Sequence, residues 1–93
     1  MKFISNSDYG KPVETGTIFY TTTNGITVTI HRIIHLDGWF LSCAQLQIDG
    51  QKLKAESLPG AIEESKEILK KYVKNVNDFI NRYTSEPWEI SRH

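Results

Sequence analysis

The sequence predicts an α+β fold in which a four-stranded antiparallel β-meander is covered by one long C-terminal helix. Two observations predict it. Residues 16–55 hold runs of β-branched and aromatic side chains separated by Asn-Gly or Asp-Gly pairs, which is typical of hairpins. From residue 58 onward, apolar side chains recur at spacings of three and four, which indicates an amphipathic helix. With 93 residues, the chain is expected to form a single domain, residues 1–93.

The strands are expected at residues 16–23, 26–36, 39–48 and 51–55. Neighbouring strands are separated by dipeptides that favour a type I′ turn, because both residues of such a turn need a positive φ. The dipeptides are Asn24-Gly25, Asp37-Gly38 and Asp49-Gly50. Two further segments are candidates for an added edge strand: Met1 to Ile4, and the tail at Trp88 and Ile90, which would form a short fifth strand.

The helix is expected to begin after Ser57, a good N-cap residue, with Pro59 in its first turn. Its apolar face continues to Tyr83. About 26 helical residues span ~39 Å, whereas a strand of nine residues spans only ~30 Å. The helix should therefore extend past the sheet, or break near Asn75, Asn77 or Asn81.

Turns at the three dipeptides would assign each strand residue to one face of the sheet. The face expected under the helix carries Phe19, Val28, Ile30, Ile34, Leu36, Trp39, Leu41 and Cys43. The other face carries Ile18, Tyr20, Ile33, Phe40, Leu46, Ile48 and Leu53, among Thr27, Thr29, His31 and His35. This second face is too apolar for a plain solvent-facing surface. Either a β-bulge near Ile33-Ile34 returns part of it to the core, or it binds a partner protein or a second copy of the chain.

The partner-binding residues expected on this second face are Tyr20, His31, Ile33, His35 and Phe40. The two histidines do not predict a metal site, because residues four apart on a strand are ~13 Å apart and both rings could not ligate one zinc ion. Cys43 is expected to be a buried structural thiol, which is unreactive. The sequence therefore predicts a protein that is not an enzyme, with no catalytic residues, no metal site and no cofactor.

The charges are balanced, with 11 Lys and Arg against 11 Asp and Glu. A net charge of zero disfavours a dedicated nucleic-acid binder and a polybasic membrane anchor. One alternative stays open, an RNA- or single-stranded nucleic-acid-binding module in which Tyr20, Trp39 and Phe40 stack on bases. Its phosphate contacts would come from Lys52, Lys54, Lys66, Lys70, Lys71 and Lys74. A single cysteine, with no signal peptide and no apolar run of membrane-spanning length, favours a cytoplasmic location.

The segments "DGWFLSCAQLQI" and "SLPGAIEESKEILKKYVKN" resemble HicB-type antitoxins, over roughly residues 17–75. That family has a β-meander with an Asp-Gly turn before an aromatic residue, and then a helix with a Ser or Thr cap and a Glu-Glu run. The matching residues are Asp37, Gly38, Trp39, Ser57, Glu63 and Glu64, while "AQLQIDG" lacks the Pro-Gly segment usual after the third strand. The resemblance implies a partial RNase-H-like fold and an inhibitor that blocks a toxin by direct contact. Small phage-encoded anti-defence proteins, including anti-CRISPR proteins, are similar in architecture and would block a defence-system component.

Overall fold

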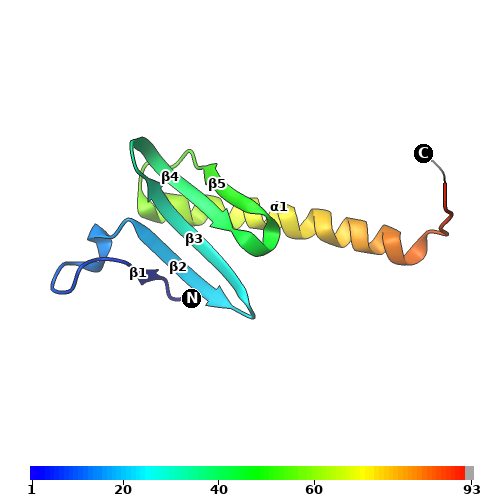
Figure 1. The fold of residues 1–93 in the computed structure, drawn as a ribbon, viewed down its shortest axis with the longest axis horizontal. Coiled ribbons are helices and arrows are strands. Elements are labelled where there is room, and N and C mark those ends of the chain that lie inside the picture. The colour runs from blue at the N-terminus through cyan, green and yellow to red at the C-terminus, as the bar shows by residue number, and fades with distance from the viewer. Residues whose placement is uncertain (92–93) are drawn as a thin grey trace.

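The computed structural model describes residues 1–91 and confirms an α+β meander, with five antiparallel strands packed against one C-terminal helix (Figure 1). The strands lie across the sheet in sequence order: β1 (Ile4–Ser5), β2 (Ile18–Thr23), β3 (Ile26–Ile33), β4 (Leu36–Cys43) and β5 (Ile48–Lys52). The helix α1 spans Leu58–Ser85, and two short 3-10 helices lie in loops at Val13–Thr15 and Ala44–Leu46.

The fifth strand comes from the N-terminus, where β1 pairs with the outer edge of β2. Among residues 86–91 there is no strand, and both Trp88 and Ile90 are exposed. The prediction of a strand in the tail is therefore wrong. The physical reason is visible in Figure 1, since α1 carries the tail far beyond the edge of the sheet.

The first hairpin has the predicted type I′ turn. Asn24 and Gly25 take φ values of 54° and 78°, and the flanking residues Thr23 and Ile26 face each other. The positive φ at both central positions is the geometry that this dipeptide favours.

The second hairpin turns earlier than predicted, at Ile34-His35. His35 takes a φ of 66°, and the turn is closed by the pair Ile33 and Leu36. Beyond that pair, three residues of β4 lie opposite one residue of β3 before the regular register resumes. Gly38 is part of this β-bulge, with a φ of 93°. The Asp-Gly pair thus supplies a bulge instead of a turn.

In the third hairpin, too, the Asp-Gly pair lies in a bulge and not in the turn. β4 and β5 are joined by a four-residue loop, in which a short 3-10 turn is followed by Gln47 at a φ of 58°. Two residues of β5, Asp49 and Gly50, then face the single residue Ser42 of β4, and Gly50 has a φ of 62°. A left-handed glycine in a bulge is favourable because it has no Cβ.

The shifted turns correct the predicted faces of the sheet. Ile34 and Leu36 were expected in the core but are exposed, because one lies in the turn and the other beside it. Ile48 and Leu53 were expected on the second face but are buried in the core, and Leu46 packs against that core. The four-residue loop and the bulge at Gly50 move these side chains to the helix side of the sheet.

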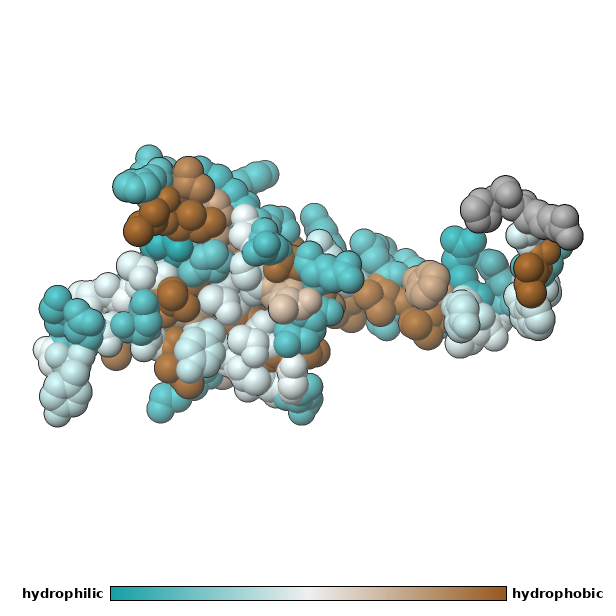
Figure 2. Space-filling view, in the orientation of Figure 1, coloured by the Kyte–Doolittle hydropathy of each residue, from teal (hydrophilic) through white to brown (hydrophobic). Residues whose placement is uncertain are grey.

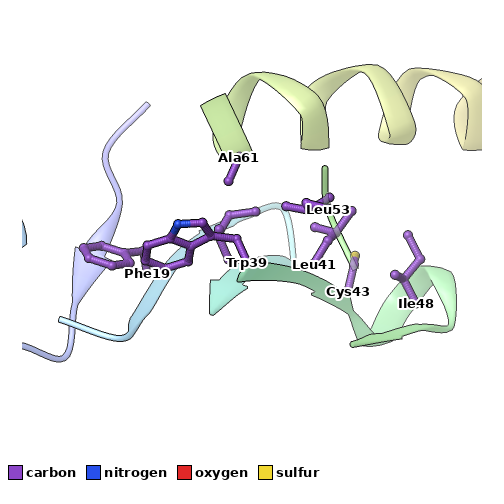
Figure 3. Packing of buried hydrophobic residues seen from close by; sticks show 8 residues of the cluster. Phe19, Trp39, Leu41, Cys43, Ile48, Leu53 and Ala61 are labelled. Carbon is purple, nitrogen blue, oxygen red and sulfur yellow. The ribbon is translucent and has the colours of Figure 1, made fainter. Parts of the chain in front are cut away.

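The core lies between α1 and one face of the sheet (Figure 3). Its buried apolar members are Phe19, Ile30, Trp39, Leu41, Cys43, Ile48, Leu53 and Ala61. Phe19 and Trp39 meet edge to face at 5.8 Å between ring centroids, a favoured aromatic geometry. The helix contributes small residues at the closest approach, Ala61 and Ser65, which let it lie near the sheet. Cys43 is a buried free thiol, as predicted.

The helix begins as predicted and continues without a break. The Ser57 hydroxyl accepts a hydrogen bond from the Gly60 N–H at 3.2 Å, and α1 passes through all three asparagines to Ser85. At 28 residues it is ~42 Å long. The core contacts end near Tyr72, so residues 73–85 extend past the sheet into solvent (Figure 1).

Candidate functional site

The helix covers one face of the sheet and leaves the other open. We call this uncovered surface the open sheet face. The strand register places on it the side chains of Ile4, Ile18, Tyr20, Thr29, His31, Ile33, Leu36, Phe40 and Ser42. Four of the five predicted binding residues are thus brought together, and the fifth, His35, lies at the corner of the sheet in the β3–β4 turn.

Phe40 forms the buried centre of the open sheet face. Only 5% of its surface is exposed, although it does not belong to the core beneath α1. The His31 ring lies beside it, with 6.2 Å between ring centroids. Phe40 therefore keeps its predicted position, but it supports the surface from within and offers a partner little contact area.

His31 is held by hydrogen bonds on both sides of its ring. Its Nε2 lies 2.8 Å from the Ser42 hydroxyl, and its Nδ1 lies 3.1 Å from the Arg32 carbonyl. The same hydroxyl accepts a bond from the Gly50 N–H at 2.9 Å. These distances fit a ring that donates from Nδ1 and accepts at Nε2, a tautomer assigned from the bonding network. The bulge in β5 is therefore tied to β4 and β3 by one polar chain across the open sheet face.

The apolar area that a partner could contact lies around this centre. Tyr20 is 37% exposed, and its neighbours Ile4 and Ile18 are more exposed still. Leu36, beside the β3–β4 turn, is exposed on the same face. Figure 2 shows a brown cluster on the surface near the turn between β3 and β4. Ile34, a residue of that turn, is 83% exposed. Sequence reasoning missed Ile4 and Leu36. For Ile4, the predicted N-terminal edge strand was a signal. For Leu36, the signal was the Ile33-Ile34 doublet, where a β-bulge was one of the two alternatives, and the register of β3 and β4 does shift between His31 and Ile33.

A second apolar surface lies on α1 beyond the sheet. We call it the projecting stripe, and its members are Val73, Val76, Phe79, Ile80 and Tyr83. Phe79 is 61% exposed and Tyr83 is 76% exposed, with their rings stacked at 5.9 Å. Figure 2 shows the brown residues of this stripe continuing from the sheet along the helix. The sequence carries a signal for this surface, because the expected helix is longer than the expected strands.

The end of the projecting stripe borders a hollow of about 520 Å³. The hollow is lined by Phe79, Arg82, Tyr83, Glu86, Pro87 and Trp88, where the chain turns away after α1. Arg82 and Glu86 form an exposed ion pair at 3.1 Å along one side of it.

In residues 1–91, no group of three or more His, Cys, Asp and Glu side chains is placed to hold one metal ion. Two of the three aromatic residues proposed for base stacking, Trp39 and Phe40, are each only 5% exposed. Two of the helix lysines, Lys66 and Lys70, pair with glutamates on the same helix.

No protein-family model, curated protein or solved structure matches this chain. The resemblance to HicB-type antitoxins and the likeness to small anti-defence proteins therefore stay sequence-based expectations. Among residues 1–91, no helix combines the length and the apolar character needed to span a lipid bilayer.

Proposed function

We propose that this protein binds another protein and inhibits it by direct contact, without catalysis, in the manner of an antitoxin or a phage anti-defence protein. The observation that supports the proposal is the open sheet face. A sheet covered on one side by a helix ordinarily presents polar side chains on the other, whereas this one exposes Ile4, Ile18 and Tyr20 side by side on β1 and β2. It also exposes Leu36 beside the β3–β4 turn. Contiguous exposed apolar surface on a small domain marks an interaction site.

The contacts within the open sheet face also favour binding. The His31–Ser42–Gly50 chain joins β3, β4 and β5, and His31 packs against Phe40, next to the strands that carry Ile4, Ile18 and Tyr20. A surface that is already ordered loses less conformational entropy when a partner binds. Tyr20 is well suited to act as an anchor, because tyrosine combines a large apolar ring with a polar tip and is enriched at binding hot spots.

The test is affinity capture from the native host, with the captured partner then purified and its Kd measured against variants. Ile18→Asp and Tyr20→Ala are each expected to weaken binding by about 10-fold or more. Tyr9→Ala is the matched control, since Tyr9 is fully exposed and lies in the loop between β1 and β2, not on a strand of the open sheet face. If Tyr9→Ala weakens binding as much as Tyr20→Ala, the open sheet face is not the binding site.

The same assay addresses the nucleic-acid alternative. If the captured material is RNA or single-stranded DNA, its affinity should fall steeply as salt rises, because bound phosphates release counterions. The affinity for a protein partner that binds the apolar residues of the open sheet face should depend only weakly on salt. A steep salt dependence with no protein captured would overturn the proposal.

A further inference from the structure

The projecting stripe is an apolar helix face that nothing in the monomer covers. It continues the same face of α1 that packs on the sheet between Leu58 and Tyr72. At about 100° per residue, Lys71, Lys74 and Asp78 lie on the opposite side of the helix, so the centre of the stripe carries no charge. Asn75 and Asn77 lie at its edges. Such a face requires a partner surface that is equally apolar.

We infer that the occupant is a second copy of the chain, and that two projecting stripes pack against each other as an antiparallel pair of helices. The stripe has the spacing of a helix–helix seam, because Val73, Val76, Ile80 and Tyr83 follow one another at intervals of three, four and three residues. This series is also symmetric about its middle. In an antiparallel pair, Val76 faces Ile80 of the second copy and Val73 faces Tyr83, with Phe79 beside the two-fold axis.

The fold itself selects the antiparallel arrangement. In a parallel pair, residues 58–72 of the two helices would also have to face each other, but in each copy that half of the face is covered by the sheet. Figure 1 shows that the end of α1 lies beyond the sheet in one copy. In the antiparallel pair, only these projecting halves would overlap, and the two sheets would lie at opposite ends. The free end of each helix then lies next to the sheet of the other copy. The apolar face of α1 is thus covered first by its own sheet and then by the helix of the second copy.

The area available is sufficient for a weak but specific dimer. Phenylalanine and tyrosine each carry roughly 150–250 Å² of surface, so the five residues of the stripe expose on the order of 500 Å² per copy. Two copies would bury about 1,000 Å², near the lower limit for a specific interface. The hollow beside Tyr83 is continuous with the stripe and adds contact surface at each end of the pair.

The first test is sedimentation of the full chain from about 1 to 100 µM, where an interface of this size is expected to assemble. The wild-type protein should pass from monomer to dimer across this range. The double variant Val76→Glu/Ile80→Glu should weaken dimerisation by on the order of 100-fold, because it buries unpaired charge in the seam. Lys74→Glu, on the opposite side of the same turn, is the control and should dimerise as the wild type does.

The second test reads the direction of the helices by disulfide formation. When Val76→Cys and Ile80→Cys chains are mixed and oxidised, the antiparallel pair favours the mixed disulfide over either symmetric one. Cys43 does not compete, because it is buried. Preference for the symmetric disulfides, a wild-type chain that stays monomeric at 100 µM, or dimers that survive the double glutamate variant would each overturn the inference. A monomer whose capture of a foreign protein is lost in that variant would assign the stripe to that protein.

Discussion

At the scale of single residues, polar side chains hold together the loops that bring the sheet and helix into register. Glu64 is the clearest case, because its carboxylate accepts backbone N–H bonds from Lys54 at 2.9 Å and from Ala55 at 2.8 Å. These bonds fix the connection between β5 and α1, and so fix where the helix begins over the core. From sequence, Glu64 looks like one more charge on a solvated helix face, since its partners are backbone groups that no side-chain pattern reveals.

Glu64→Ala is therefore expected to lower the free energy of unfolding by about 2 kcal/mol, because hydrogen bonds to a charged group are among the stronger ones. Glu63→Ala is the matched control. Glu63 is a neighbouring glutamate in an exposed ion pair with Lys66 at 2.9 Å, and exposed pairs contribute ~0.5 kcal/mol or less. Urea unfolding of the two variants measures the difference. Equal losses would show that the bonds to Glu64 contribute little.

At the scale of secondary-structure elements, the sequence predicts each strand and the helix but misplaces two of the three turns. Asn-Gly and Asp-Gly pairs mark backbone that needs a positive φ, and all three glycines, Gly25, Gly38 and Gly50, do adopt one. A turn and a bulge make the same demand on a glycine, so the dipeptide alone does not distinguish them. The choice depends on which register buries the most apolar surface against α1. At Asp49-Gly50, the long-range packing of Ile48 and Leu53 in the core therefore favours a bulge over a turn.

The helix beyond the sheet yields a second prediction. Isolated helices shorter than about 12–15 residues are marginal in water without tertiary contacts. In the Val76→Glu/Ile80→Glu chain, amides of residues 76–85 should therefore exchange with deuterium on the order of 100-fold faster than those of residues 62–72, which pack on the sheet. Hydrogen exchange followed by mass spectrometry or NMR measures this. Equal protection along α1 would mean that the helix is stabilised by something other than packing.

At the scale of the whole molecule, the shape is set by one mismatch of lengths. The Cα radius of gyration is 17.3 Å and the extents are 60 × 28 × 21 Å, whereas a compact chain of this size would have a radius of about 12 Å. The excess comes from α1, which is longer than the sheet that covers it. The candidate surfaces were accordingly only half predictable. The sequence predicts an uncovered face, because one helix can cover only one of the two faces of the sheet. It does not predict which residues lie on that face, because the bulges decide this. It predicts the projecting stripe only if the helix continues unbroken past the sheet.

Small-angle X-ray scattering of the same double variant should give a radius of gyration close to the value for the extended monomer. The physical reason is that α1 has no break at which its end could fold back onto the open sheet face. Lys74→Glu at a dimer-forming concentration serves as the comparison and should give a larger radius. A value near 12 Å for the double variant would show that the helix bends and covers the sheet in solution.

The two tryptophans lie in different parts of this elongated molecule, one in the core and the other after the C-terminal end of α1. Trp39 is buried in the core with the Arg32 guanidinium 4.2 Å from its ring centroid, while Trp88 follows the far end of α1 and is 84% exposed. The natural chain therefore carries two intrinsic fluorophores in opposite environments. Emission at short wavelength from Trp39 would report on whether the domain is folded. Emission at long wavelength from Trp88, and its quenching by iodide, would report separately on whether the distal end of the helix is occupied.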